Sequence, residues 1–306
     1  MRWAHLGVIS PPADLLDQGF RHLMAPTPVL WPDGRLRVFF TMTDPDGRGH
    51  PFSMDLDPEQ PTRVLRHATA PLMARGLRGT FDDAGAMPLS LIAQGNGSWL
   101  MYYAGFETGV QIRYRMLGGC AFGDRDGTWF TRSAPTPILE RAPGELYIRS
   151  GMCVRREGAL WRMWYVAGSE WTTIGDKELP VYDMRYLESD DPLRWGTAGR
   201  VVLPLTDPDE HGFGRPWVWQ EQGRYHLIYS IRKRSLGAYR LGYAESPDGL
   251  TWARADDRLG LEVGRCPLTE QAIMYGAVLP TERGTYVFYN GDQFGLKGFS
   301  IARRLD

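Results

Sequence analysis

Gly158-Ala159-Leu160-Trp161-Arg162-Met163-Trp164-Tyr165 is one of five copies of a phrase that recurs along the 306-residue chain. Each copy has a turn glycine, a short gap, and alternating aromatic and aliphatic positions that end in an aromatic residue. The alternating stretches begin, by subtraction, 63, 62, 64 and 61 residues apart, at Leu36, Trp99, Trp161, Tyr225 and Tyr286. Alternation with period two after a tight turn is typical of a β-hairpin. The repeat therefore predicts five units of similar size, each with a hairpin near its centre.

A second phrase, a polar turn followed by a tryptophan, comes later in three of the units, at Trp129, Trp195 and Trp252. We interpret it as a turn into an outer strand whose Trp packs inward. Four strands in about 60 residues form one blade of a β-propeller. The last unit lacks this strand, but residues 1–6 match the pattern of residues 250–254. The N-terminal strand is therefore expected to complete the last blade and to remove an exposed sheet edge.

The predicted fold class is all-β: a five-bladed β-propeller with four-stranded antiparallel blades, in a single domain covering residues 1–306. The predicted blades lie at about 18–68, 81–138, 145–204, 209–264, and 270–306 plus 1–10. Two stacked β-sandwich domains are the alternative, but they explain neither the even period nor the divided last unit.

Composition and charge exclude several classes of protein function. The hydrophobic fraction of 43% and the charged fraction of 23% suit a globular protein and exclude a disordered one. With 35 basic and 36 acidic residues, the formal charge of −1 gives no positive field for a nucleic acid. Cys120, Cys153 and Cys266 suggest neither a disulfide framework nor a zinc site, and no signal peptide or spanning segment is visible, so we expect a cytoplasmic protein. Lysine occurs only at 177, 233 and 297, a bias that fits a GC-rich genome and has no functional weight in this interpretation.

Polar residues recur at the predicted start of each inner strand. Acidic residues precede the alternating stretches of units two to five by 15 or 16 residues, at Asp83, Glu145, Asp209, Glu210 and Glu270, whereas the first unit has Arg21-His22. In a four-stranded blade this end of the inner strand and the loop after the hairpin meet at one face, so carboxylates, guanidinium groups and aromatic rings converge around one axis. Such a funnel suits a sugar, whose hydroxyls bind polar groups and whose C–H face stacks on rings. An acidic residue in a turn can equally be a cap or a solvated charge.

The chain resembles the five-bladed propeller glycoside hydrolases, the group that contains arabinanases, xylosidases, invertases and mannoside phosphorylases. The resemblance covers essentially the whole chain, and its most specific element is Phe81-Asp82-Asp83-Ala84-Gly85. The segments that carry a closer likeness are Phe81-Asp82-Asp83-Ala84-Gly85-Ala86-Met87-Pro88, Trp161-Arg162-Met163-Trp164-Tyr165, Gly214-Arg215-Pro216 and Asn290-Gly291-Asp292-Gln293-Phe294-Gly295. These segments look like a bacterial glycosidase-like subgroup associated with the synthesis of polysaccharides or glycosylated products. The chain departs from the hydrolases in the first unit, where Phe20-Arg21-His22-Leu23 stands in place of a general-base aspartate.

The resemblance and the recurring positions together imply a glycosidase-like enzyme that cleaves, transfers or rearranges a glycosidic or sugar-derived bond. Asp83 and Glu270 are predicted as the acid–base pair, with Glu210 tuning or substituting for one of them. The residues predicted to bind substrate are Arg21, His22, Asp82, Glu107, Arg149, Trp171, His211, Arg215, Tyr275 and Asp292. The arginines among them favour a phosphate, a carboxylate or a nucleotide-linked sugar.

Two alternatives stay open. In the first, a glycoside phosphorylase or transferase holds inorganic phosphate with its arginines and needs only one acid. In the second, a non-catalytic propeller binds a glycan or docks another protein. The expected partner is a small sugar or sugar-derived substrate, with no nucleic acid, no membrane, no cofactor and no essential metal, and the oligomeric state is left open.

Overall fold

The computed structural model describes residues 1–306, and nearly all of its regular structure is β-strand. Its helices are short: α1 (Ala13–Asp17), η1 (Asp256–Arg258) and η2 (Asp292–Gly295). None of them has the length and apolar character needed to cross a membrane.

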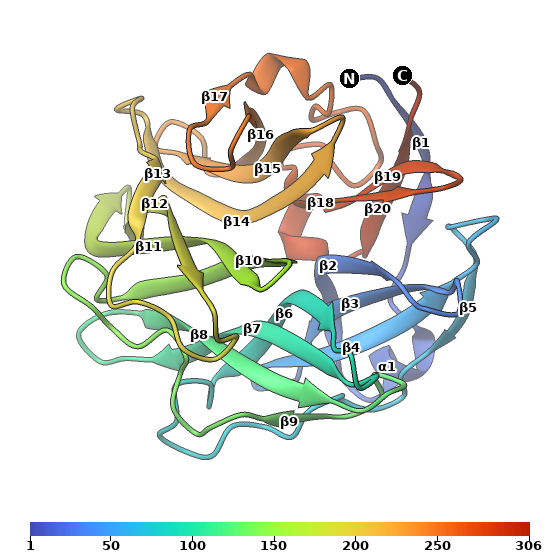
Figure 1. The fold of residues 1–306 in the computed structure, drawn as a ribbon, viewed down its shortest axis with the longest axis horizontal. Helices are drawn as coiled ribbons and strands as arrows, with labels where there is room; N and C mark the ends of the chain where they lie inside the picture. The colour runs from blue at the N-terminus through green and yellow to red at the C-terminus, as the bar shows by residue number, and fades with distance from the viewer.

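The strands pair antiparallel in five consecutive sets of four (Figure 1). The first set holds β2 (Arg21–Leu30), β3 (Leu36–Thr43), β4 (Gly49–Leu56) and β5 (Val64–His67). The second holds β6 (Gly85–Ala93), β7 (Trp99–Thr108), β8 (Tyr114–Gly123) and β9 (Phe130–Arg132). The third holds β10 (Ile148–Glu157), β11 (Leu160–Ile174), β12 (Lys177–Ser189) and β13 (Arg200–Leu203). The fourth holds β14 (Glu210–Glu221), β15 (Arg224–Lys233), β16 (Tyr239–Ser246) and β17 (Ala253–Arg254). The fifth holds β18 (Met274–Thr281), β19 (Gly284–Asn290), β20 (Phe299–Arg304) and β1 (Trp3–Ile9).

The fifth set joins the two ends of the chain. β1 pairs antiparallel with β20, with Trp3 opposite Arg304 and Ile9 opposite Phe299. The Arg2 amide donates to Asp306 Oδ1 at 3.1 Å, and the two termini lie side by side in Figure 1. The N-terminal strand thus covers the edge of β20, as the sequence predicted.

The first strand of each set lies around the centre of the molecule (Figure 1). Neighbouring sets meet through short parallel pairings: β4 with β6, β8 with β10, and β12 with β14. Asn290 ties the last set to the first, because its side-chain nitrogen donates to the Leu23 carbonyl at 2.8 Å and its oxygen accepts from the Ala25 amide at 2.7 Å. The sets are therefore arranged in a ring around a common axis.

The residues that begin the five alternating stretches lie at the same place in every set, at or near the start of the second strand. All five side chains are buried: Leu36, Trp99, Trp161, Tyr225 and Tyr286. Their neighbours come from adjacent sets, as where Trp31 of the first set stacks on Trp99 of the second with ring centroids 3.9 Å apart. Apolar contact between sets removes side-chain area from water and supplies the main force that holds the ring together.

One expectation about the outer strands is wrong. Trp129 does not pack inward, because its side chain is 48% exposed, and the buried residue is Phe130, at 1%. A shift of one residue along a strand turns a side chain to the opposite face of the sheet. Trp252 is half-buried and donates from Nε1 to the Gly249 carbonyl at 3.1 Å.

Left-handed backbone recurs at one position of the inner strands. Ala25, Gly151, Arg215 and Tyr275 have φ of 56°, 66°, 47° and 56°, and the pairing register of each strand shifts there. Such bulges bend a strand and change the direction of its side chains, at a cost of order 1–3 kcal/mol for a residue with a Cβ. The strained residues lie at one level around the axis and border the space at the centre of the ring.

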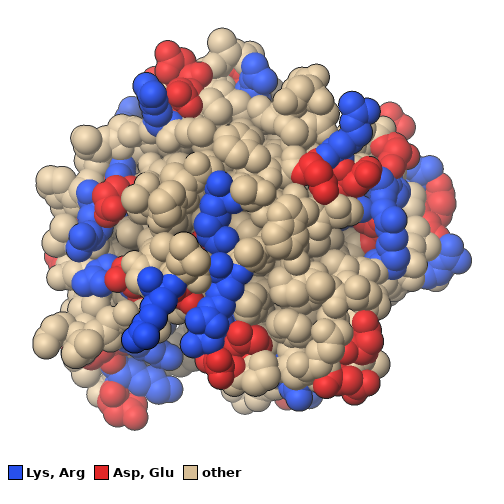
Figure 2. Space-filling view, turned by 90° about the horizontal axis from the view of Figure 1, so that it is seen from below, with Lys and Arg blue, Asp and Glu red and all other residues tan.

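In Figure 2 acidic and basic side chains lie close together in several places, mostly toward the edge of this face, with uncharged surface between them. This mixing agrees with the near-zero net charge and with the many exposed arginine–carboxylate pairs, such as Arg63 with Asp57 at 2.8 Å.

Candidate functional site

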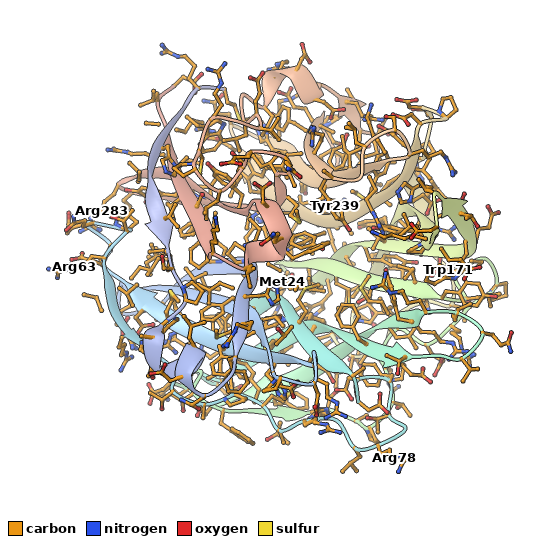
Figure 3. All side chains as sticks on the ribbon, turned by 180° about the vertical axis from the view of Figure 1, so that it is seen from behind. Met24, Arg63, Arg78, Trp171, Tyr239 and Arg283 are labelled. Atoms are coloured by element: carbon orange, nitrogen blue, oxygen red, sulfur yellow. The ribbon has the colours of Figure 1, made fainter.

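A central cavity of about 1020 Å³ lies on the axis of the ring. The first strand of every set contributes to its wall, through Met24, Met87, Ile148, Gly214 and Tyr275. Met24 is seen near the middle of the ring in Figure 3. The volume is that of a site for a small organic ligand.

The charged residues of the central cavity are mostly arginines. Six of them line it: Arg48, Arg75, Arg78, Arg113, Arg215 and Arg232. Two carboxylates do so, Asp46 and Asp83. Asp46 is exposed and forms an ion pair with Arg48 at 2.7 Å. Asp83 is half-buried; its Oδ2 accepts from the Gly79 amide at 2.9 Å, and its Oδ1 has no hydrogen-bond partner within the chain. Asp83 is thus the sheltered carboxylate of a cavity rich in cations.

Arg215 is a buried cation in the wall of this cavity, with 4% of the residue exposed. Its Nη1 donates to the Tyr275 carbonyl at 2.6 Å, and its Nη2 donates to the Pro26 carbonyl and to Thr27 Oγ1, both at 2.7 Å. No carboxylate lies within salt-bridge distance, and Nε is buried without a partner. Burial lowers the pKa of Arg215 to about 9. A buried charge without a counterion is costly, so an anionic ligand in the cavity would offset part of that cost.

Phenol rings form the side of the cavity next to Arg232. Tyr114, Tyr182, Tyr239 and Tyr275 all line it. The Arg232 guanidinium lies 5.3 Å from the centroid of the Tyr239 ring, which in turn lies 5.7 Å from that of Tyr275. Burial raises the pKa of Tyr275 to about 12, so its hydroxyl keeps its proton at neutral pH. The wall therefore offers hydroxyl donors and flat apolar faces, the two kinds of surface that a sugar ring contacts.

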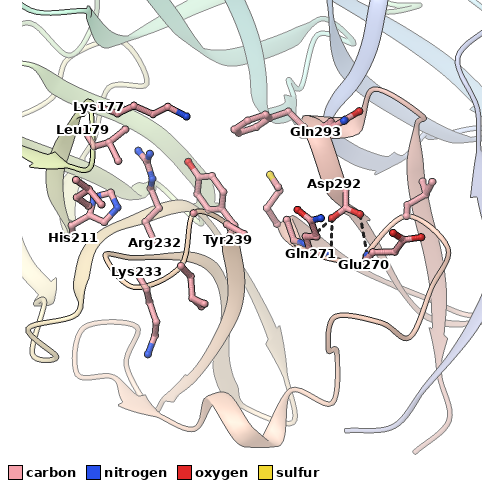
Figure 4. Close-up of a pocket in the computed structure, with 18 of the residues that line it drawn as sticks. Lys177, Leu179, His211, Arg232, Lys233, Tyr239, Glu270, Gln271, Asp292 and Gln293 are labelled. Carbon is pink, nitrogen blue, oxygen red and sulfur yellow. Dashed lines mark hydrogen bonds between the residues drawn. The ribbon is translucent and has the colours of Figure 1, made fainter.

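A lateral cavity of about 740 Å³ adjoins the central one and shares part of its wall, including Arg232, Tyr239 and Phe294. Figure 4 shows the lateral cavity. His211 lines it, and the Nδ1 of this buried ring lies 3.1 Å from the Pro180 carbonyl. A carbonyl only accepts, so Nδ1 carries the hydrogen and Nε2 is left as an acceptor. Burial lowers the pKa of His211, which favours this neutral form.

Asp292 organises the opposite side of the lateral cavity. Its carboxylate accepts from the backbone amides of Glu270, Gln271 and Ala272, at 3.0, 2.9 and 2.7 Å, as the dashed lines in Figure 4 show. Asp292 thereby fixes the loop that leads into β18. Glu270 is exposed, and in Figure 4 its carboxylate lies on the side away from Lys177 and Arg232. Nowhere in the molecule do three or more His, Cys, Asp or Glu side chains gather as a metal site.

Comparison with known proteins places this geometry in a known architecture. No family model matches the chain. The uncharacterized protein Rv1502 of Mycobacterium tuberculosis is 29% identical over 303 residues, which are 99% of each chain. Among solved structures, BT0996 in its RGII complex superposes with a TM-score of 0.75 at 18% identity, over 97% of this chain and 90% of the other. The alpha-L-arabinofuranosidase from Lactobacillus brevis superposes with a TM-score of 0.66 at 12% identity, over 92% and 90%. The chain has the fold of the β-propeller glycoside hydrolases.

The propeller fold places six of the predicted site residues in the two cavities. Asp83, Arg215 and Tyr275 line the central cavity, and His211, Glu270 and Asp292 line the lateral one. The expected pair of Asp83 and Glu270 is therefore divided between two cavities. Of these two acids, only Asp83 lines the central cavity.

Four predicted residues are instead engaged in ion pairs of the propeller and line neither cavity. Glu210 accepts from Arg254 at 2.9 and 2.7 Å. Asp82 accepts from Arg132 at 2.6 Å and from Tyr103 at 3.0 Å, one residue before Asp83 and on the opposite face of the chain. The remaining two pairs join Arg149 to Glu145 at 2.5 Å and Glu107 to Arg115 at 3.3 Å. For these four the expected contact with substrate is not supported by their position.

Three other predicted residues also lie outside both cavities. Arg21 is exposed and donates to the carbonyls of Leu16 and Phe20, each at 2.8 Å. His22 lies with Nδ1 2.9 Å from Thr43 Oγ1, and burial lowers its pKa. Trp171 packs edge-on against Tyr114 with centroids 5.5 Å apart, and in Figure 3 it lies away from the centre of the ring.

Several residues of the central cavity lie outside the predicted set: Met24, Arg75, Arg78, Tyr114, Tyr182, Arg232 and Tyr239. The sequence alone could have identified Arg232 as a site residue, because it ends the fourth alternating stretch in a cluster of three cations. Tyr114 and Tyr239 begin the third strand of their sets, just after the return loops, and Tyr182 lies in the middle of β12, whereas the prediction took only polar or charged residues and Trp171 from these loops.

Proposed function

We propose that this protein is a glycosidase-like enzyme that cleaves or transfers a glycosidic or sugar-derived bond of an anionic sugar in the central cavity. We also propose that each set of four strands is one blade of a five-bladed propeller that forms a single domain. The observation that supports the activity best is the half-buried Asp83 in a cavity lined by six arginines. The cations, with the unpaired Nε of buried Arg215 among them, suit a carboxylate or phosphate on the sugar.

The proposed chemistry assigns one proton transfer to Asp83. The anionic group of the bound substrate offsets the charge of the arginines, so that Asp83 can hold a proton in the complex. Asp83 donates this proton from its free oxygen to the glycosidic oxygen while the bond from that oxygen to the anomeric carbon breaks. The leaving alcohol takes the proton, and the electron pair of the broken bond stays on its oxygen. A nucleophile then completes the bond at the anomeric carbon, and the proton that it gives up returns to Asp83.

Phosphorolysis is the second candidate, and the distribution of carboxylates favours it over hydrolysis. A hydrolase that activates water needs a second carboxylate across the scissile bond. Asp46, the other carboxylate of the central cavity, is exposed and paired with Arg48 at 2.7 Å. Monohydrogen phosphate needs less activation than water: its oxygen attacks the anomeric carbon, its proton replaces the one that Asp83 gave away, and the products are a sugar phosphate and an alcohol.

The test is turnover by Asp83→Asn in the full chain. Purified protein is incubated with a panel of glycosides of uronic acids and phosphorylated sugars, with and without inorganic phosphate, and released sugar is measured. We expect the variant to lose about 10²–10⁴-fold in kcat while it stays folded. Asp190→Asn, at an exposed residue outside both cavities, is the matched control and should keep full activity. Unchanged turnover in Asp83→Asn would contradict the role of Asp83, and tight sugar binding with no turnover of any glycoside would favour a non-catalytic propeller.

A further inference from the structure

All three lysines of the chain line the lateral cavity: Lys177, Lys233 and Lys297. Of the 35 basic residues, subtraction of these three leaves 32 arginines, so the chain uses arginine nearly everywhere else. The lysines come from three separate places, the start of β12, the end of β15 and the loop after η2. An ammonium group is a compact charge with three rotatable donors and is a common ligand of phosphate. Genome composition explains why lysine is rare but not why every lysine is found here.

The cations of the lateral cavity are largely without acidic partners. Lys233 forms an ion pair with Asp207 at 3.3 Å and points away from the others in Figure 4. Lys177, Lys297, Arg113 and Arg232 form no salt bridge. Figure 4 shows Lys177 and Arg232 reaching into the same space. The exposed Lys177, Lys297 and Arg113 are available to a ligand, and Arg232, which packs over the Tyr239 ring, has no carboxylate partner.

The acidic residues of this cavity do not neutralise that space. Asp292 is committed to three backbone amides, and the Glu270 carboxylate lies on the far side of the drawn cavity. Asp176 is exposed and forms no salt bridge, so its single negative charge offsets only part of the charge of Lys177, Lys297, Arg113 and Arg232. The side that carries Lys177 and Arg232 therefore keeps a positive field, close to the neutral acceptor Nε2 of His211.

We propose that the lateral cavity binds the phosphate or diphosphate group of a substrate whose sugar occupies the central cavity. This inference rests on the proposed function and names its substrate class: a sugar phosphate or a glycosyl diphosphate. Arg232 and Tyr239 belong to the wall of both cavities, so a single ligand passes from sugar to phosphate along them. Lys177 and Lys297 bind the phosphate oxygens, and His211 accepts from a hydroxyl of the ligand.

The experiment measures binding of inorganic pyrophosphate to the full chain by calorimetry at low salt, in wild type and in Lys177→Ala/Lys297→Ala. We expect the double variant to raise Kd at least 10-fold. The control is Arg194→Ala/Arg200→Ala, which removes the same charge from exposed residues outside both cavities and should change Kd less than 2-fold. If pyrophosphate does not bind to wild type, or if both double variants weaken its binding equally, the proposal is wrong.

A second binding measurement distinguishes a site for a free anion from a site for an anion attached to a sugar. Hexose 1-phosphate should bind more tightly than inorganic phosphate, and the lysine double variant should weaken both. Equal affinity for the two would contradict a ligand that spans both cavities. Binding of pyrophosphate does not need Asp83, so Asp83→Asn should bind it as wild type does. A protein that binds pyrophosphate through its lysines but turns over no glycoside would overturn the proposed function and leave the lateral anion site standing.

Discussion

The carboxylate of Glu210 is buried, with 1% of its side chain exposed, and receives two hydrogen bonds from Arg254. Arg254 also reaches Asp256 at 2.6 Å, so one guanidinium joins the start of β14 to the segment after β17. Glu270 occupies the corresponding place before β18 but is exposed and has no such partner. Glu210 and Glu270 thus share a position in the repeat but differ in burial and pairing. We therefore expect substitution of the two residues to affect stability differently.

Glu210→Gln should lower the free energy of unfolding by about 1.5–3 kcal/mol, because the two hydrogen bonds from Arg254 lose their charged acceptor, while Asp256 stays as a counter-charge of Arg254. Glu270→Gln is the matched control, and the exposed site should change stability by no more than about 0.5 kcal/mol. Urea unfolding followed by tryptophan fluorescence measures both. Equal stability of the two variants would show that the Glu210–Arg254 pair contributes nothing.

His211 predicts a dependence of stability on pH. Burial lowers its pKa in the folded protein, so below the unfolded value near 6.5 the unfolded chain takes up the proton first. The free energy of unfolding is therefore highest above pH 6.5 and decreases as the pH falls through the folded pKa. His211→Asn keeps a donor for the Pro180 carbonyl and removes the titration.

Between pH 7.5 and 5.5 the variant should lose less stability than wild type, with a difference of up to about 1.4 kcal/mol. The other histidines with lowered pKa are present in both proteins and cancel in the comparison. Parallel loss of stability in wild type and variant would mean that His211 titrates normally.

At the scale of elements, four of the five inner strands, β2, β10, β14 and β18, have a left-handed bulge beside the central cavity. Gly151 on β10 has φ 66°, and a Cβ there would lie 2.7 Å from Val166 Cγ2. Gly158, in the turn before β11, has nearly the same φ of 65° but open space around it. Comparison of substitutions at the two glycines therefore distinguishes the cost of left-handed backbone from the cost of steric crowding.

Gly151→Ala and Gly158→Ala should both lose about 1–2 kcal/mol from the left-handed backbone. Gly151→Ala should lose about 1–3 kcal/mol more, because β11 must move to admit the methyl group. Chemical denaturation of the two variants side by side measures the difference. Equal losses would show that the space near Val166 adapts without cost.

The elements differ in how far the sequence predicts them. Leu36, Trp99, Trp161, Tyr225 and Tyr286 mark the second strand of every set, because a period of two after a turn directly reflects a buried strand face. The bulges at Ala25, Arg215 and Tyr275 have no such signature, since none is a glycine. The bulges and one-residue shifts decide which side chain faces the axis, so Asp83 reaches the central cavity while Asp82 is bound to Arg132. Pattern alone could locate the site but not select its residues.

At the scale of the whole molecule, the ring depends on the pairing of β1 with β20. Trp3 adds to this contact by donating from Nε1 to the Leu259 carbonyl at 2.7 Å. Removal of residues 1–9 should lower Tm by roughly 5–10 °C and increase aggregation, because β20 is left as an open edge. Calorimetry and light scattering provide the measurement.

The control keeps every strand and changes only the connections. A circular permutant that links residue 306 to residue 1 and opens the chain in the turn at Gly95-Asn96-Gly97 should retain the Tm of the parent to within a few degrees. The adjacent termini make such a link short. If the truncated protein were as stable as the permutant, pairing at the ring closure would be unimportant.

The same closure sets an order of events during synthesis. β1 leaves the ribosome before the other strands, and its partner β20 is translated nearly 300 residues later. At about 5–20 residues per second, the nascent strand waits on the order of 15–60 s with its hydrogen-bonding groups unpaired. Successive sets can fold as they emerge, whereas the fifth is completed last. Until then the growing chain exposes a strand edge to other nascent chains, and we expect a chaperone requirement to be concentrated in that interval.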